Sequence, residues 1–222
     1  MLKVEDIGYW YTTQTDYLFK DVNLTFEKGK VYTILGSSGS GKTTFLSLLA
    51  GLDQPKEGKV LFNDRDVKKI GLTNFRKKDV SIVFQAYNLF SYMSAYENIK
   101  TALRISGIKK TDEGDFIVDS LKKVGIDESL IHKRVTHLSG GQQQRVAIVR
   151  SFVTEHDLII ADEPTGNLDE NTTKEIVKLF KTIAHEQNKV VIIVTHEPEV
   201  ARESDVTYEL KNKQFSIVNN AG

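Results

Sequence analysis

Hydrophobic and polar positions along the chain predict two kinds of element that alternate. The first thirty residues contain short β-like segments, and 58–67 has the pattern of a hairpin that turns at Asn63 and Asp64. Four longer runs are apolar at nearly every position, which is typical of strands buried on both faces of a parallel sheet. These runs are 29–36, 80–85, 157–163 and 189–197.

Helical spacing of apolar residues separates these runs. It is present at 42–52, where Gly51 marks the end of the helix, and at 171–187, while helical patterns dominate from about 86 to 155. We therefore predict an α/β fold with a mixed, mainly parallel sheet, an N-terminal antiparallel β subdomain and an inserted helical subdomain. We expect one domain, 1–222, in which 1–85 and 156–222 form the core with the β subdomain and about 86–155 form the helical subdomain.

Composition and charge narrow the functional classes. Thirty basic residues balance thirty acidic ones, so we expect no nucleic-acid partner and no attraction to anionic lipid. The absence of cysteine excludes a disulfide scaffold, a zinc-thiolate site and thiol catalysis. The aliphatic runs are far shorter than the ~20 residues that span a bilayer, and Lys3, Glu5 and Asp6 lie where a signal peptide would be apolar. Any membrane role is therefore expected to depend on a partner and not on direct insertion.

A glycine-rich loop connects the predicted strand 29–36 to the predicted helix 42–52. Its sequence, GSSGSGKT, fits the P-loop pattern G-x-x-x-x-G-K-[ST] in the strand–loop–helix context that phosphate binding requires. Small residues let backbone N–H groups surround a phosphate, Lys42 adds a positive charge for the β- and γ-oxygens, and Thr43 offers a hydroxyl to Mg²⁺. The expected ATP-binding residues here are Gly36, Ser37, Ser38, Gly39, Ser40, Gly41, Lys42, Thr43 and Thr44.

Two acidic residues end the apolar run LIIADE at 158–163. A buried strand would deliver Asp162 toward Mg²⁺, through water, and Glu163 toward an attacking water as a general base. An isolated run of this kind is as often a strand that meets a solvated turn. The upstream P-loop favours the catalytic interpretation.

Four further features follow a definite order. Gln85 ends a predicted strand, LSGGQQQR opens a predicted helix at 138–145, EPTGNLD ends at Asp169, and His196 follows the last predicted strand. Across essentially the whole chain this set resembles the ATP-binding cassette (ABC) ATPases, with their RecA-like P-loop NTPase fold. The resemblance assigns Gln85 to the metal and the attacking water, and His196 to the γ-phosphate. Alone, Gln85 or Asp169 would more often be an ordinary polar loop residue, and His196 would more often be a capping or hydrogen-bonding group.

The second glycine-rich helix start, SGGQ, cannot hold ATP by itself. A helix N-terminus contributes about 0.3–1 kcal/mol to anion binding, or about 2 kcal/mol in favourable geometry. The resemblance implies a head-to-tail homodimer in which this signature closes on the γ-phosphate bound by the partner's P-loop, with Asp169 in contact across the interface. The signature residues in that role are Ser139, Gly140, Gly141 and Gln142.

Adenine recognition in ABC ATPases depends mostly on stacking against an aromatic ring. Tyr11 fits this role by its position ahead of the first P-loop strand, and Tyr9 and Trp10 are adjacent alternatives. Burial of the ring in a strand would be the purely structural interpretation.

Two stretches, 36–63 and 161–169, look like the bacterial subfamily of lipoprotein-release and macrolide or peptide export ATPases. The resemblance implies an ATP-hydrolysing subunit at the cytoplasmic face of the plasma membrane that drives a separate integral membrane permease. The alternative is an ABC ATPase that acts on chromosomes or ribosomes without a permease. The segment between Lys42 and Asp162 is too short for the long coiled coil of the chromosomal relatives, and a P-loop kinase or GTPase would leave the signature unexplained.

The segment 86–99 is where family members receive a helix from the permease. Phe90, Tyr92 and Met93 are the candidate contacts on that interpretation. Burial in the core of the helical subdomain is nearly as good an explanation for these side chains.

Overall fold

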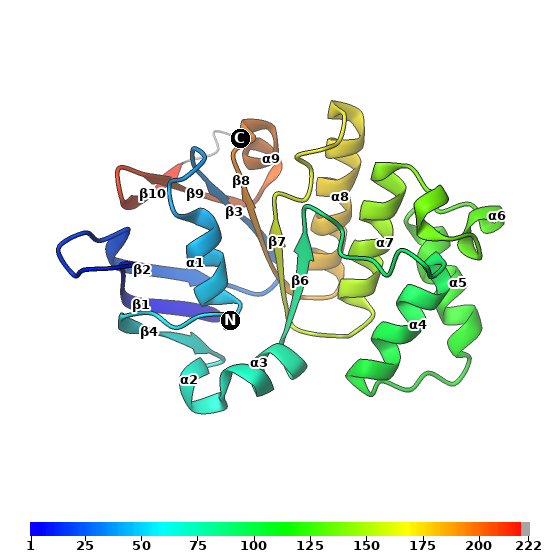
Figure 1. Ribbon diagram of the computed structural model, residues 1–222, viewed down its shortest axis with the longest axis horizontal. Helices are drawn as coiled ribbons and strands as arrows, with labels where there is room; N and C mark the ends of the chain where they lie inside the picture. Colours follow the sequence, from blue (N-terminus) through cyan, green and yellow to red (C-terminus); the bar gives the residue numbers. More distant parts are fainter. Residues whose placement is uncertain (219–222) are drawn as a thin grey trace.

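The computed structural model describes residues 1–218, and within them the strands form two sheets (Figure 1). One sheet is antiparallel, with the order β2-β1-β4-β5. Its strands are β1 (Leu2–Tyr9), β2 (Phe19–Phe26), β4 (Glu57–Phe62) and β5 (Arg65–Asp66). The predicted turn at Asn63 and Asp64 joins β4 to β5, and both residues have the positive φ that such a tight turn requires.

The other sheet has the order β10-β9-β3-β8-β7-β6 and is parallel except for its β9–β10 edge. Its strands are β3 (Lys30–Leu35), β6 (Val80–Phe84), β7 (Leu158–Asp162), β8 (Val190–Thr195), β9 (Val206–Lys211) and β10 (Gln214–Val218). The predicted fold class, with a mainly parallel sheet and an antiparallel N-terminal sheet, is confirmed.

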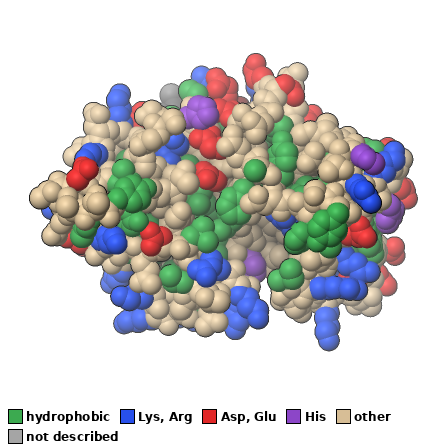
Figure 2. Space-filling model, viewed as in Figure 1, with side chains coloured by type: hydrophobic (Ala, Val, Ile, Leu, Met, Phe, Trp, Pro, Cys, Tyr) green, Lys and Arg blue, Asp and Glu red, His purple; other side chains and the backbone are tan. Residues whose placement is uncertain are grey.

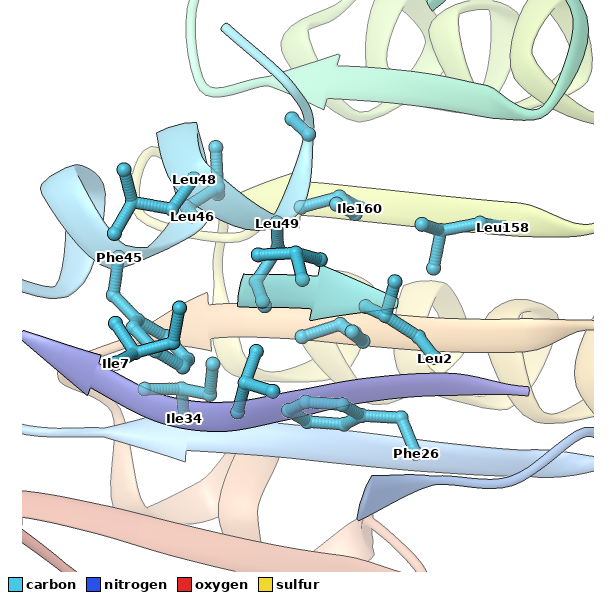
Figure 3. Packing of buried hydrophobic residues seen from close by; sticks show 14 of the residues in the cluster. Leu2, Ile7, Phe26, Ile34, Phe45, Leu46, Leu48, Leu49, Leu158 and Ile160 are labelled. Atoms are coloured by element: carbon cyan, nitrogen blue, oxygen red, sulfur yellow. The ribbon is translucent and has the colours of Figure 1, made fainter. Parts of the chain in front are cut away.

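The two faces of the parallel sheet pack against different layers, which explains why its strands are apolar throughout. Leu158 and Ile160 face the β1–β2–β4 sheet and α1 (Lys42–Leu49), together with Phe26 and Phe45 (Figure 3). The alternate residue Ile159 packs on the opposite face with residues of α7 (Gly140–Phe152), α8 (Glu170–Glu186) and α9 (Pro198–Glu203).

A separate hydrophobic cluster holds the helices of the inserted segment together. These helices are α4 (Ala95–Ser106), α5 (Glu113–Lys123), α6 (Glu128–Ile131) and α7, with a short 3₁₀ turn at Val135–His137. Helix α7 belongs to both layers, because Ala147 packs on the sheet while Val146 packs among these helices. Movement of the helical segment is therefore expected to reach the sheet through α7.

Sequence patterns did not reveal several of the shorter elements. Helices α2 (Val67–Ile70) and α3 (Leu72–Lys78) are separated by Gly71, and each is too short to display helical periodicity. Strands β9 and β10 carry polar residues at alternate or successive exposed positions, so they lack the apolar run of the central strands. Among residues 1–218, no helix combines the length and apolar character that crossing a bilayer demands.

Candidate nucleotide-binding site

The predicted chemical groups lie at the carboxyl edge of the parallel sheet. Leu35 pairs with Thr195, and Asp162 pairs with both Phe84 and Val194, so β3, β6, β7 and β8 end at one level (Figure 1). The residue that follows each strand is therefore delivered to a common edge, which is where open α/β sheets bind ligands. The sheet topology brings together residues that are far apart in sequence.

The loop 36–41 curls between β3 and α1 and encloses the side chain of Lys42. Gly41 has φ 106° and lies so close to Leu18 that an added Cβ would be 2.8 Å from Leu18 Cγ, so only glycine fits there. The Lys42 side chain is buried, with the residue 5% exposed, and its ammonium donates hydrogen bonds to the carbonyl oxygens of Gly36 (2.8 Å) and Ser37 (2.9 Å). The ammonium is thus held inside the loop at the position where a bound phosphate would need a positive charge.

A cavity of about 590 Å³ opens beside this loop. Its lining residues are Tyr11, Leu18, Ser38, Gly39, Gly41, Lys42, Thr43, Thr44, Gln85, Glu163 and His196. All of these except Leu18 are residues that the sequence predicts for the site. Leu18 is a half-buried aliphatic residue in a short loop, and no sequence signal distinguishes it from many others.

Gln85 enters the cavity from the end of β6. An added Cβ at Gly166 would lie 3.0 Å from Gln85 Nε2, so the amide packs over the turn that follows Glu163. Phe84 pairs with Asp162 across β6 and β7, so Gln85 lies at the strand end next to Asp162.

Glu163 is held by groups at the end of β8. His196 Nδ1 lies 3.0 and 2.9 Å from the two carboxylate oxygens, and the hydroxyl of Thr195 donates to Oε2 over 3.2 Å. The backbone of Glu163 has φ 46°, a left-handed conformation that is costly for a residue other than glycine and is found most often at functional sites. The arrangement aims a carboxylate with a fixed orientation into the cavity.

Asp162 has a different environment from its neighbour. Its Oδ1 is buried and has no hydrogen-bond partner among residues 1–218, so it can accept a ligand. Burial raises the pKa of Asp162, the nearby charge of Glu163 raises it further, and Lys42 opposes the shift. A divalent cation would satisfy this oxygen, and the Thr43 hydroxyl and Gln85 amide oxygen are the hard ligands that Mg²⁺ prefers.

The three aromatic candidates for adenine occupy different positions. Tyr11 is 68% exposed, lines the cavity and shares a hydrogen bond between its hydroxyl and that of Thr44. Tyr9 is buried and donates to Asp53 over 2.6 Å. This hydrogen bond, together with burial and the charge of Asp53, raises the pKa of Tyr9 to about 12. Trp10 packs edge-on against Tyr17. Of these three rings, Tyr11 is the one that lines the cavity.

The signature segment lies outside this cavity. Ser139 caps α7 through a reciprocal pair of hydrogen bonds with Gln142, at 3.3 Å and 2.9 Å. An added Cβ would lie 2.9 Å from the Tyr87 hydroxyl at Gly140, and 2.7 Å from Thr172 Cγ2 at Gly141. The helix start therefore packs closely under the side chains of Tyr87 and Thr172. None of these four signature residues lines the cavity.

Asp169 also lies apart from the cavity and has a clear local role. It caps α8 by accepting hydrogen bonds from the Thr172 backbone N–H (3.0 Å) and hydroxyl (2.6 Å). These hydrogen bonds hold the pKa of Asp169 below its usual range. The sequence did not predict this capping role.

Comparisons with known proteins agree with the geometry. The family model described as "ABC transporter" matches residues 19–166. The uncharacterized ABC transporter ATP-binding protein YclH of Bacillus subtilis is 53% identical over 220 residues, which cover 99% of this chain and 97% of that protein. The lipoprotein-releasing system ATP-binding protein LolD of Buchnera aphidicola is 38% identical, with 89% and 88% covered. The dimeric post-hydrolysis structure of the ATP-binding cassette MJ0796 bound to ADP and Pi superimposes with a TM-score of 0.87 at 32% identity, and all of both chains is covered.

Proposed function

The chain belongs to the ABC transporter family as an ATP-hydrolysing, ATP-binding subunit, and we propose that it works as a head-to-tail dimer that drives a separate permease. The observation that carries this proposal is the cavity in which Lys42, Gln85, Glu163 and His196 meet. The strand topology that gathers them is built from 1–85 and 156–222, and the inserted segment, about 86–155, supplies the signature.

ATP would bind with its phosphates in the loop 36–44 and its adenine against Tyr11. Lys42 then exchanges its carbonyl partners for phosphate oxygens, and the N-terminus of α1 adds its dipole. Mg²⁺, when bound with ATP, would be held by Thr43 and Gln85 directly and by Asp162 through water, and would offset charge on the phosphate oxygens. The unpartnered Asp162 oxygen supports this assignment.

Hydrolysis would proceed by attack of a water oxygen on the γ-phosphorus, with ADP as the leaving group. Glu163 accepts a proton from that water, and its hydrogen bonds from Thr195 and His196 keep the carboxylate oriented for the transfer. His196 lies at the cavity wall, where its ring can reach the γ-phosphate and stabilise charge that develops there.

A dimer would complete the site. The signature residues begin a helix, yet they do not line the cavity of their own chain, so they are free to face a phosphate on a second chain. The dimeric structure of the related cassette MJ0796 supports this arrangement. Asp169 would contact the partner while it continues to cap α8.

A groove of about 300 Å³ between α3, β6 and α4 is the candidate permease site (Figure 2). Phe90 and Ile105 line it and are 40% and 68% exposed, and Tyr92, which packs beside Phe90, is 66% exposed. Met93 is instead half-buried beside Thr101. Exposed apolar side chains of this size favour a protein partner. If that partner is the permease, the cassette would be held at the cytoplasmic face of the plasma membrane by its contact with the permease.

The transported molecule would be a lipoprotein, peptide or antibiotic that is released or exported. The identity to LolD across most of both chains supports this class. The exposed apolar side chains at this groove, Phe90, Tyr92 and Ile105, also favour a permease-coupled role over action on chromosomes or ribosomes.

Substitution Glu163→Gln tests the cycle. It removes the proton acceptor but keeps a similar shape, so we expect ATP turnover to fall by about 100-fold or more and Mg-ATP to trap a dimer. Turnover is measured by phosphate release, and assembly by size-exclusion chromatography with light scattering. A variant that remains monomeric with Mg-ATP at every accessible concentration would show that the isolated chain does not use this cycle.

A further inference from the structure

The turn that follows Gln85 has an unusual backbone. Tyr87 and Asn88 are consecutive residues with φ 59° and 49°, both in the left-handed region. Asparagine tolerates this region better than most side chains, but tyrosine rarely adopts it. The pairs Asn63–Asp64 and Asn212–Lys213 have the same backbone because each forms a two-residue hairpin turn. Tyr87 and Asn88 lie between β6 and α4 and form no hairpin, so surrounding contacts must hold them there.

Arg150, near the end of α7, supplies those contacts. Its guanidinium donates from Nη2 to the carbonyl oxygen of Tyr87 (2.9 Å) and from Nη1 to that of Asn88 (2.5 Å). The planar fork of an arginine suits two neighbouring acceptors in a way that a lysine ammonium does not. Burial lowers the pKa of Arg150, so the two carbonyl contacts also replace water that the charge has lost.

The turn connects the two motifs of the proposed site. On one side, Gln85 lines the nucleotide cavity. On the other side, the Tyr87 hydroxyl lies where an added Cβ at Gly140 would be 2.9 Å away, against the first turn of the signature helix. Arg150 is on the same helix as Gly140, so α7 contacts the turn at its first residue and again near its last.

We propose that Arg150 is a positioning residue for ATP hydrolysis, which clamps the left-handed turn at Tyr87 and Asn88 and so fixes Gln85 and the signature helix relative to each other. This inference rests on the proposed function, since it assumes that both motifs act on ATP. Arg150 does not line the nucleotide cavity but lines the groove between α3 and α4, so the tests use the isolated chain without a permease. Its loss would leave ATP binding intact and slow the chemical step.

The first test separates binding from turnover in Arg150→Met. We expect kcat to fall at least tenfold while the affinity of the monomer for ATP stays within twofold of wild type. Trp10, the single tryptophan of the chain, is next to Tyr11 and can report binding by energy transfer to a methylanthraniloyl-ATP. Arg150→Lys keeps the charge but not the two-pronged guanidinium. Its kcat should be closer to that of Arg150→Met than to that of the wild type. Arg104→Met, at an exposed arginine of α4, is the matched control and should hydrolyse ATP at the wild-type rate.

The second test measures the turn directly. Amide hydrogen exchange of 85–90 should rise in Arg150→Met and stay at the wild-type level in Arg104→Met, a readout that does not depend on hydrolysis.

Three results would overturn the inference. The first is that Arg150→Met has the kcat of the wild type. The second is that Arg150→Met loses ATP affinity as much as kcat, which would indicate a merely structural defect. The third is that hydrogen exchange of 85–90 is unchanged in Arg150→Met. A wild-type chain that hydrolyses no ATP would instead overturn the proposed function, and the exchange measurement would still decide whether the clamp exists.

Discussion

At the scale of single residues, Asp162 and Glu163 are neighbours in sequence with opposite surroundings. Glu163 receives hydrogen bonds from Thr195 and His196, whereas Oδ1 of Asp162 is buried without a partner. The charged form of Asp162 is therefore disfavoured in the fold, and burial, the largest cause, raises its pKa above 3.8. The protein keeps a destabilising carboxylate where a cation with ATP would offset it.

Substitution Asp162→Asn should therefore change stability and activity in opposite directions. Between pH 3.8 and the raised pKa of Asp162 in the folded protein, the native state binds more protons than the unfolded chain. The free energy of unfolding therefore decreases as pH rises through this range. In EDTA and without nucleotide, the Asp162→Asn variant should have a higher Tm than wild type at neutral pH, and the gain should shrink as pH falls toward 3.8. Mg²⁺-dependent turnover should fall roughly 10- to 100-fold, as for other ligands that act through metal-bound water.

Calorimetry from neutral to acidic pH measures the stability difference, and phosphate release over a Mg²⁺ titration measures the activity. Equal Tm values for the two proteins at neutral pH would contradict the stability argument. Turnover that is unchanged at low Mg²⁺ would contradict the metal role.

Most residues that face the cavity could be predicted, because they either belong to the P-loop pattern or are polar residues that directly follow an apolar strand. Lys42, Glu163 and His196 carry such signals in the sequence itself. Leu18 and Arg150 do not, because their roles depend on packing between segments that are far apart in the chain. Sequence pattern therefore indicates which groups do chemistry, and tertiary packing decides which residues hold them in place.

At the scale of elements, the start of α7 combines a helix cap with an exposed surface. Ser139 is exposed although its hydroxyl caps the helix, and Gly140 and Gly141 are held tightly under Tyr87 and Thr172. The long, periodic helices such as α7 and α8 could be predicted, whereas α2 and α9 could not, since four or six residues cannot show a helical period.

Substitutions at Ser139 can separate the cap from the interface. Ser139→Arg places a bulky side chain at the proposed interface and removes a cap worth ~1 kcal/mol, so ATP-dependent dimerisation and turnover should be lost while the monomer still binds nucleotide. Ser139→Asp keeps a good cap but adds a negative charge toward the partner's γ-phosphate. It should retain the wild-type Tm and still lose turnover.

Ser139→Thr, which keeps both the hydroxyl and the cap, is the control and should retain most of the activity. Tm, dimerisation with Mg-ATP and phosphate release are measured on all three variants. If Ser139→Asp dimerises and hydrolyses ATP as the wild type does, the signature does not face a phosphate.

At the scale of the whole molecule, the groove between α3 and α4 and the nucleotide cavity meet at one segment, 84–90. Gln85 lines the cavity, and Phe90 lines the groove, so the two sites are only a few residues apart along the chain. A partner in the groove would thus rest against Phe90 and against Arg150, whose guanidinium binds the carbonyl oxygens of Tyr87 and Asn88. ATP occupancy and permease position are expected to influence each other through this segment.

The groove assignment predicts a selective defect for Ile105→Asp. Ile105 is 68% exposed, so an aspartate there should not disturb folding, and ATP hydrolysis by the isolated chain should stay within twofold of wild type. When the permease covers this position, the aspartate would lose water and weaken the contact. Loss of a contact that carries much of the binding energy typically costs at least about 2 kcal/mol, or roughly a 30-fold loss of affinity for the permease. Ile217→Asp on β10 is the matched control, because Ile217 is 65% exposed and far from the groove along the sheet. Each variant is co-expressed with a candidate ABC permease and purified through that permease. Recovery of Ile105→Asp at the level of Ile217→Asp would show that the permease binds elsewhere.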